Sequence, residues 1–144
     1  MNASQSTDTV MTVAQISELL DREFPQHIGK VTDMGKNTAA MRLAVDDAHL
    51  RPGGTVSGPT MMALADICLY VAILAQIGPV SLAVTTNLNI NFLRKPEPAK
   101  AIVAEAKLLK LGKRLAVGEI AIYSEGEEEP VAHVTATYSI PPRS

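Results

Sequence analysis

Apolar positions in the first half of the chain follow the period of a helix, then of strands, and then of a buried helix. Residues 27–33 and 39–45 favour two extended runs, and residues 34–37, Met-Gly-Lys-Asn, predict a hairpin turn between them. After a turn-rich segment, a nearly continuous apolar stretch runs to Ile77 and predicts a long helix. Ahead of these elements, helical spacing predicts a short helix that ends near Pro25, with the apolar positions Val10, Val13, Ile16, Leu19 and Leu20.

From Val80 the apolar period changes to two, which is the period of a strand with one buried face. Further strands are predicted at 101–109, 114–123 and 131–140, and Gly112 marks the turn between the first two of them. One face of the strand that begins at Val80 carries Leu82, Val84, Thr86, Leu88, Ile90 and Phe92, and the other carries Thr85, Asn87, Asn89 and Asn91.

The predicted elements follow one another as helix, two strands, long apolar helix and four strands. Because the long helix is apolar around most of its circumference, other elements must cover it, and an antiparallel sheet that curls around it is the simplest cover. We therefore predict an α+β fold with an antiparallel sheet of about six strands wrapped around one long central helix, plus a short N-terminal helix. A chain of 144 residues fits one domain, which we place at residues 10–144 after a flexible N-terminus at 1–9. Unpaired sheet edges favour a homodimer or homotetramer.

Composition argues against several classes of protein. The chain has no Trp, 3% aromatic residues and a net charge of −2, whereas nucleic-acid binding needs basic and base-stacking side chains. The first residues lack a basic segment followed by an apolar run, so we expect no secretory signal and a cytoplasmic location. The apolar run 67–77 is shorter than the ~20 residues that span a bilayer, so we expect no membrane segment. The acidic run 127–129 indicates a solvated turn, and without a cluster of zinc-ligand spacing we expect no metal or cofactor.

A single acid interrupts the longest apolar stretch. Asp66 is the only charged side chain from residue 52 to residue 93, and its neighbours one helical turn away, Met62 and Tyr70, cannot neutralise it. Because burial of an unpaired carboxylate is costly, Asp66 must meet a polar group from elsewhere in the fold or line a wet cavity. It is either a functional acid or a structural one, bonded to a threonine hydroxyl or a backbone N–H at a gap or a dimer contact. The only cysteine, Cys68, is interpreted as a small core residue.

The residues before this acid have the features of a helix N-terminus. Ser57 is a good N-cap, and Pro59 falls in the first turn, where its missing N–H costs little. Gly58 leaves an unshielded backbone N–H at the positive end of the helix dipole. Such a donor stabilises a carbonyl oxygen that becomes negative during acyl transfer, an effect often worth ~3–4 kcal/mol. A well-capped helix without this role is the other interpretation.

Three segments together resemble one enzyme family. They are "GTVSGPTMMALAD", which ends at Asp66, "VTTNLNINFLRKP" at 84–96 and "LLKLGKRLAVGEIAIY" at 108–123. The chain resembles the hotdog-fold acyl-CoA thioesterases of the phenylacetate-pathway (PaaI-like) type from about Ile16 to Pro141. The resemblance implies a hotdog fold and hydrolysis of an acyl-CoA in a site shared across a dimer interface. It also implies that Asp66 is the catalytic acid, that Gly58 is the oxyanion glycine, and that Thr85 helps to position the attacking water.

The chain departs from the family pattern around the oxyanion glycine. Ser57 stands where the motif has His, Arg51 where it has Asn, and Pro59 where it has a second Gly. Ser57 can form hydrogen bonds but cannot replace an imidazole in acid–base work, and His49 is a candidate for that part. His27 and His133 have no better claim.

The resemblance also implies cations that hold the CoA phosphates near the mouth of the site. Each of these residues is otherwise an ordinary surface charge, and Arg51 binds a phosphate or carboxylate or is simply solvated. The residues assigned to substrate binding are Arg51, Gly54, Met62, Arg94, Lys113 and Arg114, with Lys95 and Lys110 as further candidate cations.

The leading functional prediction is therefore an acyl-CoA thioesterase with Asp66, Gly58, Ser57 and Thr85 in its catalytic site. A second prediction is an acyl-CoA-binding or acyl-CoA-sensing protein that has lost hydrolysis together with the motif His. A hotdog hydratase or dehydratase ranks last, because its different His-and-acid motif does not occur in the sequence. The acyl group itself is not specified by the adaptable Met and aliphatic side chains.

Overall fold

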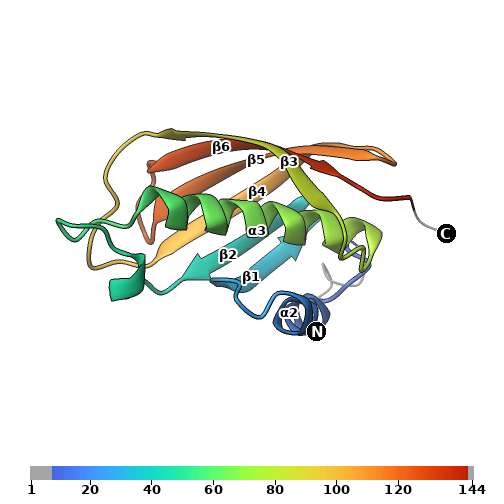
Figure 1. The fold of residues 1–144 in the computed structure, drawn as a ribbon, viewed down its shortest axis with the longest axis horizontal. Helices are drawn as coiled ribbons and strands as arrows, with labels where there is room; N and C mark the ends of the chain where they lie inside the picture. The colour runs from blue at the N-terminus through green and yellow to red at the C-terminus, as the bar shows by residue number, and fades with distance from the viewer. Residues whose placement is uncertain (1–7, 143–144) are drawn as a thin grey trace.

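The computed structural model describes residues 8–142 and confirms the predicted order of elements (Figure 1). Of the flexible segment expected at 1–9, residues 1–7 lie outside the described part of the chain. The helices are α2 (Val13–Glu23), the short 3-10 helix η1 (Asp47–His49) and α3 (Gly58–Ile77). The strands are β1 (Lys30–Gly35), β2 (Thr38–Leu43), β3 (Val84–Phe92), β4 (Ile102–Leu111), β5 (Leu115–Ser124) and β6 (Ala132–Ser139).

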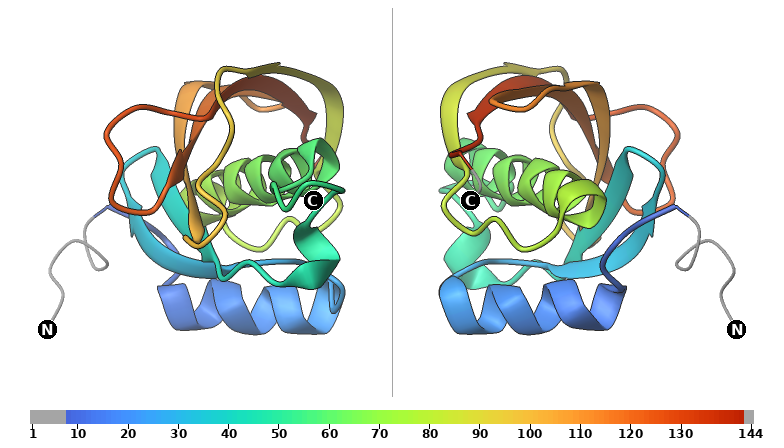
Figure 2. Two further views of the ribbon diagram at one scale, coloured as in Figure 1. Left: turned by 90° about the vertical axis from the view of Figure 1, so that its left-hand side faces the viewer. Right: turned by 90° about the vertical axis from the view of Figure 1, so that its right-hand side faces the viewer.

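All the strands belong to one six-stranded antiparallel sheet, with the order β1-β2-β4-β5-β6-β3. The sheet curves around α3, so that strands lie on more than one side of the helix (Figure 2). Helix α2 packs beside β1 at one edge of the sheet and also contacts α3. This arrangement is the predicted hotdog architecture, with β3 at the other edge.

Helix α3 is capped at both ends and buried along most of its length. The Ser57 side chain accepts a hydrogen bond from the Thr60 N–H at the start, and Gly78, with a φ of 96°, follows the last turn. The Sγ of Cys68 donates to the carbonyl oxygens of Ala39 (3.5 Å) and Ala104 (3.6 Å), and burial raises the pKa of this thiol to about 12. The prediction of a core cysteine is therefore confirmed.

The length argument against a membrane segment was wrong. Helix α3 has 20 residues, and an 18-residue stretch of it that includes Asp66 has a mean hydropathy of 1.9, so the helix is long and apolar enough to cross a membrane by length and composition. In the fold this helix is the core element, and 61% of its 18-residue apolar stretch is buried inside the domain. A core helix covered by a curved sheet passes the same test as a membrane span, because both need apolar residues around the whole circumference.

Two predicted element starts also need correction. The strand expected from Val80 begins at Val84, because residues 80–83 form a turn in which the Ala83 N–H bonds to the Val80 carbonyl (3.1 Å). Leu82 lies in this turn and is 76% exposed. The first helix begins at Val13 rather than Val10, because Thr12 forms a capping box with Gln15.

Gly118 of β5 faces the core helix, and we expect Gly118→Ala to destabilise the fold. A Cβ at this position would overlap Leu69 Cδ1 and lie 3.0 Å from the Lys107 carbonyl oxygen. Because a backbone atom cannot move aside cheaply, the free energy of unfolding should fall by about 1–3 kcal/mol, measurable by thermal unfolding. Combining Gly118→Ala with Leu69→Ala should cost less than the sum of the two single changes, since the overlap with the Leu69 side chain is then removed and only the contact with the Lys107 carbonyl remains. Wild-type stability in Gly118→Ala would contradict this packing.

Candidate functional site

Asp66, on the third turn of α3, receives hydrogen bonds from two hydroxyl groups of the sheet. Thr85 Oγ1 donates to Asp66 Oδ1 (2.6 Å), and the Tyr138 hydroxyl donates to the same oxygen (2.8 Å) and also lies 3.0 Å from the Asp66 carbonyl oxygen. Thr85 of β3 and Tyr138 of β6 are direct cross-strand partners, so their side chains point to the same face of the sheet. The predicted polar partner from elsewhere in the fold is therefore confirmed, and it includes Thr85.

The half-buried Asp66 carboxylate lines a cavity of about 660 Å³. The walls come from the end of α2 and the following residues 23–28, from one face of α3, from the start of β3, and from Tyr138. Most of these walls are apolar, and an acid among them is the arrangement expected of a ligand site rather than of a solvated surface. Three aromatic rings meet here: Phe24 packs edge-on against Tyr70 at 5.2 Å, and Tyr70 lies 6.1 Å from Tyr138.

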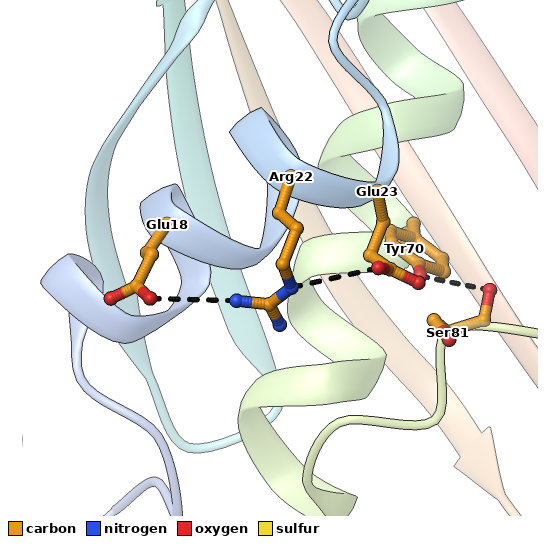
Figure 3. Close-up of polar contacts among 5 residues, drawn as sticks. All are labelled: Glu18, Arg22, Glu23, Tyr70 and Ser81. Atoms are coloured by element: carbon orange, nitrogen blue, oxygen red, sulfur yellow. Dashed lines mark hydrogen bonds and ion pairs between the residues drawn. The ribbon is translucent and has the colours of Figure 1, made fainter.

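Tyr70 fixes one wall of this cavity. Its hydroxyl donates to the Ser81 carbonyl (3.1 Å), which joins α3 to the turn before β3 (Figure 3). Burial, together with the charge of Glu23, raises the pKa of Tyr70 to about 12, so the phenol stays a protonated donor at neutral pH. Beside it on α2, Arg22 bridges Glu18 (3.4 Å) and Glu23 (3.5 Å) at the protein surface (Figure 3).

The N-terminus of α3 lies at a separate cavity of about 390 Å³, lined in part by Arg51, Gly58, Phe92 and Arg94. Among the described residues, no acceptor is found for the Gly58 N–H, as expected for the first helical residue. A Cβ at Gly58 would lie 3.0 Å from Phe92 Cζ, so the ring packs directly on the helix start and would have to shift slightly for any larger residue. The Ser57 hydroxyl is engaged in the cap, because it accepts from the Thr60 N–H (3.2 Å) and bonds to Thr60 Oγ1 (2.8 Å).

The predicted catalytic residues therefore form two groups within one chain. Asp66 and Thr85 line one cavity, whereas Gly58 lines the other. Asp66 follows Gly58 by eight positions on α3, which at the rise of an α-helix is about 12 Å. One thioester carbonyl cannot contact both groups of the same chain at that distance.

Of the residues assigned to substrate binding, only Arg51 and Arg94 line either of these two cavities. Arg51 and Arg94 line the cavity at Gly58, and Arg94 also pairs with Glu129 (2.7 Å). Lys113 and Arg114 lie at the β4–β5 turn, where Arg114 Nε donates to the Ile140 carbonyl (3.1 Å). The two remaining assignments line neither cavity: Gly54 sits in a turn with a φ of 81°, and Met62 is exposed on α3.

The three histidines lie in different parts of the fold. His49 was the candidate to replace the motif His, but its Nδ1 accepts from the Asp46 N–H (3.0 Å) in the η1 capping box, and His49 does not line the Asp66 cavity. His27 does line that cavity, and its Nε2 lies 3.1 Å from Asp21 Oδ1. His133 pairs with Glu119 (3.0 Å) away from both cavities.

No group of three or more His, Cys, Asp or Glu side chains within residues 8–142 is arranged to hold a metal ion. The acidic run 127–129 instead forms exposed ion pairs, Lys100–Glu127 (2.6 Å) and Arg94–Glu129 (2.7 Å), as expected of a solvated turn.

Sequence reasoning missed Tyr138 and the aromatic walls formed by Phe24 and Tyr70. One signal for Tyr138 was present. The inward-facing residues of β6 are Ala132, Val134, Ala136 and Tyr138, and Tyr138 is the only one of these four with a polar group on its side chain. A buried tyrosine hydroxyl needs a hydrogen-bond partner. No local pattern indicated that this partner is Asp66.

The sequence profile of the thioesterase superfamily matches residues 53–131. A protein from Silicibacter sp. TM1040, provisionally assigned as a thioesterase, has a similar crystal structure with a TM-score of 0.86 and 48% identity, covering 96% of this chain and 97% of that one. A mutant of the phenylacetic acid degradation protein PaaI from Thermus thermophilus is 26% identical, with a TM-score of 0.71 over 84% of this chain and 100% of that one. A thioesterase from Haemophilus influenzae, 21% identical, shares the fold with a TM-score of 0.82 over 94% of each chain. No curated protein matches this chain.

Proposed function

The chain belongs to the thioesterase superfamily, and we propose that it hydrolyses the thioester of an acyl-CoA to a free acid and CoA. The observation that carries this proposal is the Asp66 carboxylate, held by two hydroxyls at the wall of a largely apolar cavity of about 660 Å³. Apolar walls suit an acyl group, and a fixed carboxylate beside it supplies the group that thioester hydrolysis needs.

In the proposed reaction Asp66 takes a proton from a water molecule as the water oxygen adds to the thioester carbonyl. The carbon–sulfur bond then breaks, CoA leaves as a thiol after receiving a proton, and the acyl group leaves as a carboxylic acid. Direct attack by Asp66, followed by hydrolysis of the resulting anhydride, gives the same products. In either route the Thr85 hydroxyl holds Asp66 and keeps oxygen lone pairs that can accept a hydrogen bond from the water.

The Gly58 N–H is proposed to stabilise the developing negative charge on the carbonyl oxygen. Because Gly58 and Asp66 of one chain are too far apart, this donor must come from a second subunit. The sheet offers a surface for pairing with a second subunit, since β3 is an edge strand whose outer side pairs with no strand of the described chain. Val84 and Phe92, at its two ends, are 55% and 52% exposed.

A twofold axis perpendicular to β3, lying just outside its free edge and level with its middle, would pair it antiparallel with its copy. Full overlap of Val84–Phe92 would then place the Thr85 end of one strand beside the Phe92 end of the other. Thr85 contacts Asp66, and Phe92 packs on Gly58. The pairing would thus bring the Asp66 of one subunit toward the partner's Gly58, and we propose a homodimer, alone or as half of a homotetramer, with one site at each end of the shared strand pair.

The proposed substrate phosphates would be held by Arg51 and Arg94, which line the Gly58 cavity. Lys113 and Arg114 lie at the same end of the sheet as Val84, because Leu115 and Val84 both pair with Ser139. The proposed strand pairing would therefore bring these two cations to the same end of the strand pair as the partner's Arg94.

The test of the function is steady-state release of CoA from a panel of aryl and medium-chain acyl-CoAs, detected with a thiol reagent. Cys68 is buried with a raised pKa, so it adds little background to this assay. Absence of turnover with every substrate contradicts hydrolysis.

One observation favours a second candidate, an acyl-CoA-binding or acyl-CoA-sensing protein. The Ser57 hydroxyl is engaged in the helix cap, and none of the three histidines lines the Gly58 cavity, so the described residues offer no imidazole there. A non-catalytic protein would show no turnover but would gain thermal stability as acyl-CoA concentration rises.

We expect Arg51→Ala combined with Arg94→Ala to raise the KM for acyl-CoA by about 10-fold or more, because each lost guanidinium removes a charge-assisted contact to phosphate. The kcat should change by less than about twofold, since the contacts are equal in ground and transition states. Initial rates across substrate concentrations measure both constants.

Two controls isolate the phosphate contacts. The KM for the corresponding acyl-pantetheine, which has no phosphates, should be the same in both proteins. Arg42→Ala, which breaks an exposed pair with Glu125 away from both cavities, should leave the acyl-CoA KM at the wild-type value. An equal rise for acyl-pantetheine would assign the effect to a disturbed fold instead.

A further inference from the structure

Tyr138 and Thr85 converge on one oxygen of Asp66 and leave the other. Both hydroxyls donate to Oδ1, at 2.8 Å and 2.6 Å, and no residue from 8 to 142 donates a hydrogen bond to Oδ2. A carboxylate in water rotates freely and exchanges its two oxygens. Two donors on one oxygen remove that freedom, because rotation would break both hydrogen bonds at once.

The two donors sit on a rigid frame. Thr85 and Tyr138 are paired across β3 and β6, and a bulge between Thr85 and Asn87 follows directly on β3. Bulges redirect side chains next to functional sites, and this one interrupts the regular pairing directly after Thr85, the residue that contacts Asp66. Tyr138 is 3% exposed, so packing fixes its ring as well as its hydroxyl.

Tyr138 also contacts the helix backbone, since its hydroxyl lies 3.0 Å from the Asp66 carbonyl oxygen. Side chain and main chain of Asp66 are therefore tied to the same atom of β6. Thr85 makes only the side-chain contact. This difference gives Tyr138 a larger part than Thr85 in setting where the carboxylate stands relative to the sheet.

We infer that Tyr138 is a positioning residue for the proposed hydrolysis. Its hydroxyl holds Oδ1 of Asp66, so that Oδ2 is the oxygen that meets the water or the thioester carbonyl. The inference rests on the proposed function and adds a residue and an atomic assignment to it. Tyr138 does not exchange protons in the reaction. Burial, followed by the charge of Asp66, raises the pKa of Tyr138 well above its ordinary value, so the phenol remains a hydrogen-bond donor over the working pH range.

We expect Tyr138→Phe to lower kcat by about 10-fold and to change KM by less than about twofold. The reason is that the variant no longer fixes the orientation of the Asp66 carboxylate but keeps the cavity for the acyl group. Steady-state kinetics with the best substrate of the wild-type protein measure this split. Tyr123→Phe is the matched control, because Tyr123 is on the neighbouring β5, lines neither cavity and should retain wild-type kinetics.

The double variant Tyr138→Phe with Asp66→Asn distinguishes positioning from general damage. A residue that acts only through the Asp66 carboxylate has nothing left to position once that carboxylate is an amide, so the double variant should match Asp66→Asn alone. A further loss of similar size in the double variant would overturn the inference and assign Tyr138 a structural part. Thermal unfolding of each variant shows whether the fold is retained.

The outcomes for the two proposals differ. If the wild-type protein hydrolyses thioesters and Asp66→Asn does not, but Tyr138→Phe has the wild-type kcat, the inference is wrong and the proposed function stands. If the wild-type protein hydrolyses no thioester, both fail. A rise in KM with kcat unchanged would also overturn the inference, because it would make Tyr138 a substrate-binding residue.

Discussion

Asp66→Asn is expected to lower kcat for acyl-CoA hydrolysis by about 10³-fold, the range seen when an enzyme loses its general base or acid. Asparagine has the size of aspartate, and its amide oxygen can still accept from Thr85 and Tyr138, so the geometry at Oδ1 is kept. What is lost is the basic and nucleophilic oxygen at Oδ2, where an amide nitrogen would stand. The KM should change little, because the phosphates and the acyl group are held by other residues.

The matched control is Asp47→Asn, an exposed acid in η1 that lines neither cavity and should retain wild-type kinetics. Asp66→Ala should be as inactive as Asp66→Asn. It also removes the acceptor of the Thr85 hydroxyl and leaves Tyr138 only the main-chain carbonyl oxygen of residue 66, so it should be the less stable of the two. Turnover close to wild type in both Asp66 variants would rule out a catalytic part for this acid and leave the structural interpretation of it.

Mixing two nearly inactive proteins should restore activity, which is the second large effect. One parent carries Asp66→Asn, and the other carries Arg51→Glu with Arg94→Glu, which repels the substrate phosphates from the Gly58 cavity. If each site combines Asp66 of one subunit with the Gly58 cavity of the other, a mixed dimer has one site with both lesions and one intact site. Random exchange of subunits should recover about a quarter of the wild-type kcat/KM.

The two models of the site predict opposite results in this experiment. If one subunit contained a whole site, every site in the mixture would carry one lesion, and mixing would restore nothing. The exchange is made by mild denaturation and refolding of the two proteins together, with each parent refolded alone as a control. Sedimentation of the wild-type protein gives a second check, because a monomer that hydrolyses thioesters would contradict the shared site.

Local sequence pattern predicted most of the elements because their signals lie within a few residues. The cap at Ser57, the turn at residues 34–37 and the period-two strands after α3 all follow from short-range chemistry, and the structure places each within a few residues of the prediction. The errors in element starts occurred at a capping box and at a turn, where local hydrogen bonds override the apolar pattern. The segment 80–83 alternates like a strand but turns, because Gly78 ends α3 and the chain must reverse to reach β6.

The candidate site was only partly predictable. A buried acid implies a partner, and Thr85 was correctly placed at Asp66 through the family resemblance. For His49 as a replacement imidazole, the structure shows that the Ser57 N–H donates to the His49 carbonyl and that the ring Nδ1 accepts within the cap of its own loop. Closeness along the chain between His49 and Ser57 did not indicate where the ring points.

The sequence by itself determined that one acid stands in an apolar core helix and that a free N–H stands at the start of that helix, because both follow from residue type and helical spacing. Only the tertiary structure decided what these groups contact. The pairing of β3 with β6 brings Thr85 and Tyr138 to one oxygen of Asp66, although the two residues are far apart along the chain. The straight axis of α3 keeps Asp66 and Gly58 about 12 Å apart. Contacts of this kind depend on how strands separated in sequence are paired and aligned, and no local pattern of residues encodes that register.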